Sequence, residues 1–169
     1  MVDIIAWDSC VLIDAIQKKD GIYEHIETMI RKAEAGELYI VVSSVSVAEI
    51  QYLGELSATG LSKVEQNTLI DSWMDQPYIV IRSADRATCR QAALLAQQSN
   101  SMGYGKLTPI DSIILATAIK HEAETLVTLD GKNKSSGLIK FSGKFGSPAL
   151  NIRTPDDWSK QSEFVGGGF

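Results

Sequence analysis

The chain has 169 residues, 44% of them hydrophobic, and its formal net charge of −5 argues against a general nucleic-acid coat protein. A chain of this length buries about 70% of its unfolded surface on folding, so one domain with its own core is expected. Cys10 and Cys89 lie far apart without other ligands nearby, which excludes a disulfide framework and a zinc site. Without a basic leader or a run of about 18 apolar residues, we expect a cytoplasmic protein with no membrane contact.

The first half of the chain alternates short apolar runs with segments of helical spacing. Short apolar runs bounded by polar or turn residues predict buried strands over 2–7, 38–42 and 78–81. The spacing of apolar residues between them predicts helices over 9–17, 21–36, 44–56 and 62–75.

The second half continues the alternation, with predicted helices over 84–98 and 108–121 and predicted strands over 126–129 and 149–153. Strands separated by helices favour βαβ units, so the predicted class is α/β, a three-layer α/β/α fold with a mostly parallel central sheet. We expect a single domain over 1–153, with a loop insert at 131–147 and a C-terminal tail at 154–169.

Four acids lie beside apolar segments, at strand ends or early in helices. Asp8 ends the first strand, Asp130 ends the fourth, Glu49 follows the second strand, and Asp111 is the third helical residue after Thr108. In a parallel sheet these positions converge on one edge. Acids that meet there would repel one another unless a cation neutralised them, and ligands that offer only oxygen select Mg²⁺ or Mn²⁺.

Each acid also has an ordinary structural explanation. Asp8 is a favoured helix N-cap, and Asp111 complements a helix dipole. Ser46 and Glu49 have the spacing of a capping box, and an Asp at 130 followed by Gly is a common turn. These explanations do not say why four such acids occupy equivalent positions at one sheet edge, and this favours a shared site.

The four acids stand in motifs that read DSCVLIDA, SVAEI, TPIDSIILATAIKH and LVTLD along the chain. Together these motifs resemble the PIN-domain nucleases, in particular the VapC-like toxin ribonucleases, over about residues 3–130. The resemblance implies that Asp8, Glu49, Asp111 and Asp130 bind one or two Mg²⁺ or Mn²⁺ ions and hydrolyse RNA, with Ser9 beside them. It also implies a small antitoxin partner and a homodimer.

The chemistry of a phosphodiester sets the role of each acid. A bound metal ion activates a water for in-line attack and stabilises charge on the transferring phosphoryl group. We expect Asp8 and Asp111 to be the central ligands and Asp130 and Glu49 to complete the site. Ser9 is expected to position a water or a ligating carboxylate.

Two other classes of function remain open. One is a PIN-like module that binds RNA or protein without catalysis, although a pure binder has no need of mutually repelling acids. The other is a dehalogenase-like phosphatase, which also has a nucleophilic Asp after its first strand. Such enzymes usually have Asp-x-Asp, and here Cys10 occupies the place of the second acid.

The segment 131–147 contains four lysines, two phenylalanines and no acid, and it lies in the more basic half of the chain. The simplest interpretation is a solvated loop. The alternative is that its lysines contact RNA phosphates while Phe141 and Phe145 stack on unpaired bases.

Overall fold

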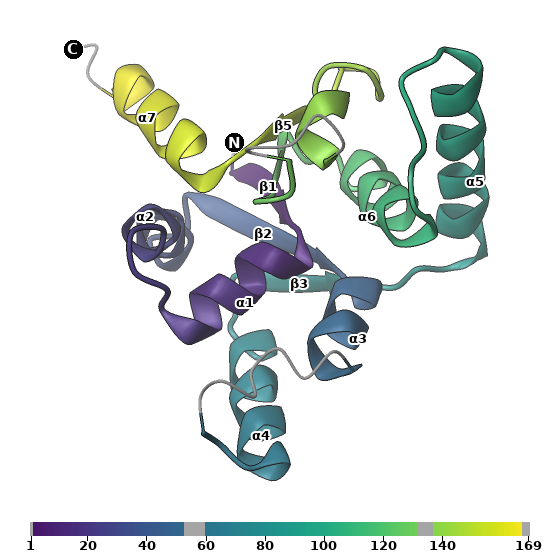
Figure 1. Ribbon diagram of the computed structural model, residues 1–169. Helices are drawn as coiled ribbons and strands as arrows, with labels where there is room; N and C mark the ends of the chain where they lie inside the picture. Colours follow the sequence, from purple (N-terminus) through teal and green to yellow (C-terminus); the bar gives the residue numbers. More distant parts are fainter. Residues whose placement is uncertain (1, 53–59, 132–136, 167–169) are drawn as a thin grey trace.

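The computed structural model describes residues 2–52, 60–131 and 137–166, with only the backbone described over 161–166 (Figure 1). Its described strands form a five-stranded parallel sheet in the order β3-β2-β1-β4-β5. The strands are β1 (Asp3–Trp7), β2 (Leu38–Ser43), β3 (Ile79–Arg82), β4 (Thr125–Val127) and β5 (Asn151–Arg153). The predicted parallel α/β fold is confirmed.

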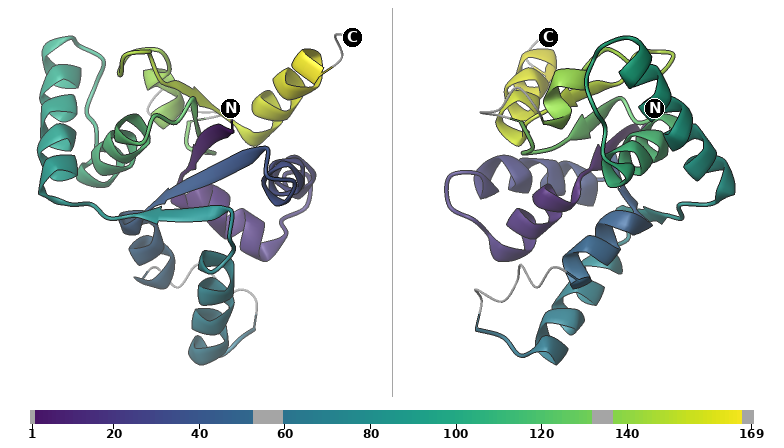
Figure 2. Two further views of the ribbon diagram at one scale, coloured as in Figure 1. Left: turned by 180° about the vertical axis from the view of Figure 1, so that it is seen from behind. Right: turned by 45° about the vertical axis from the view of Figure 1, so that its right-hand side comes forward.

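Helices cover both faces of the sheet (Figures 1 and 2). The α-helices α1 to α4 are Ser9–Gln17, Tyr23–Glu34, Ser44–Tyr52 and Lys63–Met74. They are followed by α5 (Arg86–Ser101), α6 (Pro109–Lys120), the 3-10 helix η2 (Leu138–Phe141) and α7 (Pro155–Gly166). Helices α5 and α6 lie on the side of the sheet away from α1 and α2 (Figure 2).

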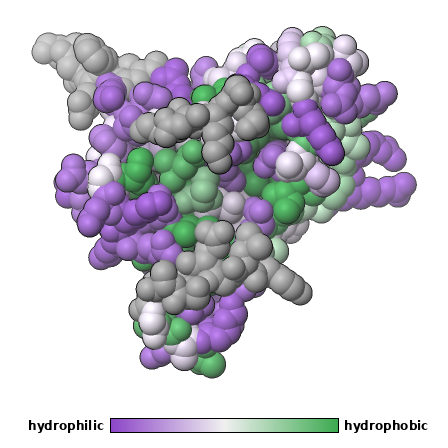
Figure 3. Space-filling view, viewed as in Figure 1, coloured by the Kyte–Doolittle hydropathy of each residue, from purple (hydrophilic) through white to green (hydrophobic). Residues whose placement is uncertain are grey.

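The core has two parts because alternate strand residues face opposite sides of the sheet. In β1, Ile5 and Trp7 pack with α1, α2 and α4, while Ala6 between them packs with α5, α6 and η2. Both faces of the sheet are therefore buried. On the face seen in Figure 3, hydrophilic side chains lie over α2 and α5 at the two sides, and hydrophobic ones are visible between them.

Most predicted elements are present with shifted ends. The helix predicted over 84–98 is displaced to Arg86–Ser101 because Asp85 is its N-cap, accepting a hydrogen bond from the Thr88 amide at 2.8 Å. The strand predicted over 126–129 ends at Val127, so Asp130 lies three residues beyond it. The helix predicted over 44–56 is described as far as Tyr52, and the rest of that prediction lies outside the described residues.

The segment 154–169 is not a simple tail, because it contains α7. The Thr154 hydroxyl caps this helix by donating to the Asp157 carboxylate at 2.8 Å and accepting from the Asp157 amide at 3.4 Å. Helix α7 then packs on α2, where the Lys32 ammonium lies 5.5 Å from the centre of the Trp158 ring. The glycines near the C-terminus suggested a tail, but the Thr-Pro-Asp-Asp start favours a helix.

The segment 131–147 is also more than a solvated loop. Residues 132–136 lie outside the described part, but Leu138, Phe141 and Phe145 are buried in the core on the α5 and α6 side of the sheet. Glycine, serine and lysine dominate the composition of this segment and hid its apolar residues, which lack a regular period.

No helix within the described ranges is long and apolar enough to cross a membrane. Cys10 and Cys89 are both free, as expected, and Cys89 is exposed on α5.

Burial of Phe145 makes a direct prediction about stability. Because this side chain is only 3% exposed, Phe145→Ala should lower the free energy of unfolding by about 3–5 kcal/mol, as measured by urea denaturation. Met102→Ala is the matched control, since Met102 is 55% exposed and its loss should cost less than about 0.5 kcal/mol. Equal effects of the two substitutions would contradict the burial of this segment.

Candidate functional site

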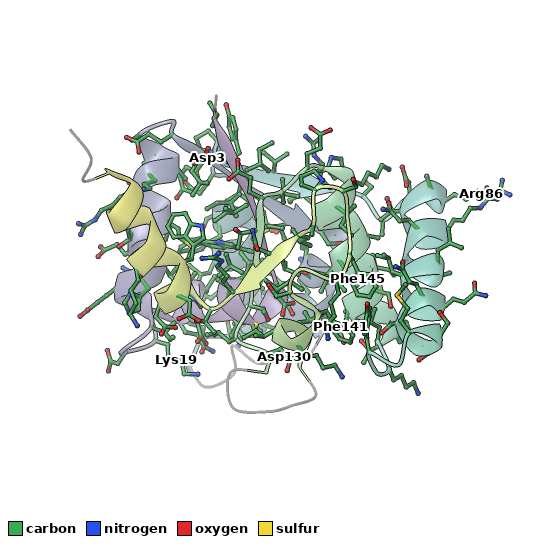
Figure 4. All side chains as sticks on the ribbon, turned by 90° about the horizontal axis from the view of Figure 1, so that it is seen from above. Asp3, Lys19, Arg86, Asp130, Phe141 and Phe145 are labelled. Atoms are coloured by element: carbon green, nitrogen blue, oxygen red, sulfur yellow. The ribbon has the colours of Figure 1, made fainter. Side chains whose placement is uncertain are left out.

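Three of the four predicted acids lie at the carboxyl edge of the sheet. Asp8 directly follows β1, Asp130 follows β4, and Asp111 is the third residue of α6, the helix that leads back into β4. Figure 4 shows Asp130 at the edge opposite Asp3, where β1 begins. The parallel topology therefore gathers these acids from distant parts of the sequence.

Asp8 is a buried carboxylate with a full set of hydrogen-bond donors. Its Oδ1 accepts from the Ser9 amide at 2.7 Å and from the Ser9 hydroxyl at 3.2 Å. Its Oδ2 accepts from the Thr128 hydroxyl at 2.7 Å and from the Cys10 thiol at 3.2 Å. The first bond makes Asp8 the N-cap of α1, so the structural explanation of this acid is correct, and it leaves open a second role for the carboxylate.

Thr128 links two of the acids, and the sequence analysis did not identify it. Its hydroxyl, which is completely buried, donates to Asp8 Oδ2 and accepts from the Asp130 amide at 2.9 Å. One side chain thereby ties the end of β1 to the segment that follows β4. The available signal was the hydroxyl residue two positions before the acid in VTLD.

Asp130 joins the site to η2. Its Oδ2 accepts from the Leu138 amide at 3.0 Å, and its backbone carbonyl accepts from the Ile139 amide at 3.4 Å. Gly131 permits this return of the chain: its φ is +98°, and a Cβ atom on Gly137 would collide with the Gly131 backbone. The prediction of a turn at Asp130 and Gly131 was therefore reasonable, and the turn brings η2 beside the acid.

Asp111 experiences the charges of the other two acids. The Thr108 hydroxyl accepts from the Asp111 amide at 3.1 Å, which confirms Thr108 as the N-cap of α6. Burial raises the pKa of the Asp111 carboxyl, the hydrogen bond with the Thr108 hydroxyl lowers it, and the carboxylates of Asp8 and Asp130 add smaller increases. Asp111 therefore lies within electrostatic range of the other two acids.

Glu49 is the sixth residue of α3 and is half-buried. The capping-box interpretation is wrong, because α3 begins at Ser44 and Ser46 lies inside it. The Ser46 hydroxyl is buried and has no hydrogen-bond partner among the described residues. The role of Glu49 in a shared site stays a prediction.

The donors fit a hard cation in kind, because carboxylate oxygens that repel one another are stabilised by Mg²⁺ or Mn²⁺. As the side chains stand, no three His, Cys, Asp or Glu residues in the described ranges form a group able to hold a metal ion. A cation at Asp8 would have to share or displace one of the four donors on its carboxylate. Ser9 is the simplest to displace, because its hydroxyl can rotate and its amide still caps α1.

One family model matches most of the chain. The family model described as the PIN domain matches residues 5–134. No curated protein matches the chain.

Solved structures with the same fold include bacterial toxin–antitoxin proteins. VapBC2 of Rickettsia felis, bound to a DNA fragment from its promoter, matches with a TM-score of 0.61 at 20% identity, covering 88% of this chain and 98% of that one. DNA-bound VapBC of Salmonella typhimurium gives 0.62 at 16% identity, covering 92% and 99%. VapC20 of Mycobacterium tuberculosis, a toxin that cleaves the sarcin-ricin loop, gives 0.58 at 12% identity, covering 76% and 91%.

The position of Thr128 predicts the effect of removing its hydroxyl. Thr128→Val keeps the shape of the side chain but removes the hydroxyl that accepts from the Asp130 amide and the shortest hydrogen bond to Asp8 Oδ2, leaving that oxygen only the Cys10 thiol, which should lower the free energy of unfolding by about 1.5–3 kcal/mol. Thr128→Ser keeps the hydroxyl and is the matched control, with a smaller loss from the missing methyl group. If urea denaturation found Ser as damaging as Val, packing rather than hydrogen bonding would explain the residue.

Proposed function

Because the chain belongs to the PIN domain family, we propose that it is a metal-dependent endoribonuclease and the toxin of a toxin–antitoxin pair. The observation that carries the proposal is that Asp8, Asp111 and Asp130 lie at one edge of the sheet, where Thr128 joins Asp8 to the segment that holds Asp130. Acids that repel one another lower the stability of the folded protein. A divalent cation bound between them would relieve the repulsion, and a metal-dependent nuclease needs such a cation.

The proposed catalytic residues are Asp8, Glu49, Asp111, Asp130 and Ser9. When bound, Mg²⁺ or Mn²⁺ lowers the pKa of a coordinated water and stabilises charge on the phosphoryl oxygens. Asp8 and Asp111 would be the central ligands, with Asp130 and Glu49 completing the set. Ser9, whose hydroxyl donates to Asp8 at 3.2 Å, would orient this carboxylate or hold a water.

Cys10 provides an argument against a dehalogenase-like phosphatase. Such an enzyme needs a proton donor or acceptor two residues after its nucleophilic Asp. Burial raises the pKa of the Cys10 thiol well above its usual range, and the neighbouring Asp8 raises it further. A thiol that stays protonated at neutral pH cannot serve as a base, and it would be a poor acid for a leaving alkoxide.

The proposed partners follow from the toxin assignment. One neighbouring structure is named as a toxin–antitoxin complex from Klebsiella pneumoniae, and VapC20 of Mycobacterium tuberculosis is named as a toxin. We therefore propose a small antitoxin protein as the partner of this chain, and a homodimer as its own assembly.

Cleavage of RNA tests the proposed function directly. The wild-type protein should fragment a mixed RNA pool in Mg²⁺ or Mn²⁺ but not in EDTA, and Asp8→Asn or Asp111→Asn should abolish the activity. Asp71→Asn is the matched control, because Asp71 is an exposed acid on α4 and its loss should leave cleavage unchanged. Metal-independent cleavage, or full activity in Asp8→Asn, would contradict the proposed site.

A pool that binds the protein but stays intact under every metal condition would favour the non-catalytic PIN-like module. Hydrolysis of a simple phosphate monoester instead of RNA would favour the phosphatase.

Stability provides an independent prediction. The helix dipole of α6 favours a charge at Asp111 by about 0.3–1 kcal/mol, whereas burial, with smaller contributions from Asp8 and Asp130, raises the pKa of Asp111 and disfavours that charge. Without metal, Asp111→Asn should therefore raise the melting temperature at pH 7. Saturating Mg²⁺ should raise that of the wild type, with a gain of about 2.7 kcal/mol at 100 times Kd. A metal-free Asn variant that melts below the wild type would leave Asp111 only its favourable interaction with the helix dipole of α6.

A further inference from the structure

A basic surface lies beside the acidic edge, on its α6 side. We use the name lysine surface for Tyr104, Lys106, Lys140 and Lys144. Lys140 belongs to η2, the element whose first amide hydrogen bonds to Asp130. Lys106 lies five residues before Asp111 in the chain. Through η2 the lysine surface therefore adjoins Asp130, one of the proposed metal ligands.

Aromatic rings hold two of these ammonium groups in place. The Lys140 Nζ lies 4.8 Å from the centre of the Phe141 ring. The Lys144 Nζ lies 4.6 Å from the centre of the Tyr104 ring and 6.0 Å from that of Phe141. Phe145, in turn, packs edge-on against Tyr104. The lysines rest on rings anchored in the core, so less side-chain entropy is lost when they bind an anion.

In the described ranges, the charges of Lys140 and Lys144 lie on aromatic rings and not against carboxylates. Within the part of the chain that the structure describes, neither Lys140 nor Lys144 forms an ion pair. The stretches 91–110 and 131–155 contain no Asp or Glu at all. Two cations held against one ring without a counter-ion repel each other, and an anion from outside the chain would relieve that repulsion.

The two phenylalanine rings themselves do not face the solvent. Phe141 and Phe145 are 2% and 3% exposed, so they cannot stack on RNA bases, and that part of the sequence-based hypothesis is wrong. Phe141 supports both lysines and Phe145 packs behind it, while the half-buried Lys140 and the exposed Lys144 provide the positive charge. This favours recognition of the phosphate backbone over recognition of bases.

We propose that the lysine surface binds phosphate groups of a single-stranded RNA segment adjoining the bond to be cleaved. The inference rests on the proposed ribonuclease function and adds the path of the substrate. An RNA strand is favoured over an acidic peptide because its phosphates can continue from the lysines to a cation held by the neighbouring acids. The pairing of a basic surface with an acidic edge thus suits a ligand that meets both through phosphate.

The test measures binding separately from cleavage. In an Asp8→Asn background, the affinity for a labelled single-stranded RNA is measured by fluorescence anisotropy over a series of salt concentrations. Changing both Lys140 and Lys144 to Gln should lower the slope of log affinity against log salt by about 1.4, because each lost contact accounts for about 0.7. At 0.1 M salt this corresponds to about a 25-fold loss of affinity.

Two control variants separate charge from structure. Lys32→Gln removes a lysine that also rests on an aromatic ring, but on α2, and it should leave the slope unchanged. Changing Lys140 and Lys144 to Arg keeps both charges and should keep affinity within a few-fold of the parent. An unchanged slope in the Gln variant, or the same loss in the Arg variant, would overturn the inference.

Cleavage assays on proteins that keep Asp8 separate a failure of the proposed ribonuclease function from a failure of the lysine surface alone. The double Gln variant should show a raised KM for RNA with a smaller change in kcat, because Lys140 and Lys144 bind substrate away from the reacting atoms. If the wild type cleaves RNA and the double variant keeps the parental KM, only the lysine surface is wrong. If the wild type does not cleave RNA in any metal, the proposed function and this inference both fall. Tighter binding of duplex DNA than of the RNA strand would also overturn the inference.

Discussion

The hydrogen bond from Thr128 to Asp8 is the contact on which the arrangement of the acidic edge depends. β1 and β4 are neighbouring strands, and their backbone pairing ends near Trp7 and Val127. Beyond that point a buried hydroxyl continues the connection from side chain to side chain, at 2.7 Å. A hydrogen bond to a charged group contributes about 1.5–3 kcal/mol, enough to hold a buried carboxylate that its neighbours repel.

The acids and the lysines have opposite effects on the binding of a polyanion. An exposed acidic edge would repel a polyanion, and the net charge of −5 would add to this repulsion at long range. Lysines next to the acids change the local field within about one Debye length, roughly 8–10 Å in ordinary buffers. Because Asp130 accepts a hydrogen bond from the Leu138 amide, η2 and its Lys140 are held beside this acid. A substrate would therefore contact the lysines and the acids together.

The parts of the fold that depend on local sequence were predictable. β1 and β2 are short apolar runs, and Thr108 followed by Pro109 marks the start of α6 unambiguously. The acids were also predictable as candidates, because parallel topology alone assigns Asp8 and Asp111 to one edge. What they bind stays a proposal, because roles depend on ligands that spacing does not reveal.

The missed features depend on contacts between distant segments. In the sequence, Thr128 is one of many threonines. Its role comes from the hydrogen bond to Asp8, which lies 120 residues earlier in the chain. Phe141 and Phe145 are buried only because α5 and α6 provide a surface for them, and no local period announces this. Likewise, Trp158 gains a role through packing on α2. Tertiary context decided each of these cases.

The contact between Gly131 and Gly137 has a consequence for how the family can diverge. The two backbones lie so close that a Cβ atom on either glycine would collide with the other, so the ends of the stretch between them are held together. Lengthening a loop whose ends are already closed costs only about 0.6 kcal/mol for each doubling of its length. Insertions and deletions between these two glycines can therefore accumulate without moving Asp130 or η2. Evolution is free to vary this stretch from one relative to the next while the acidic edge keeps its geometry.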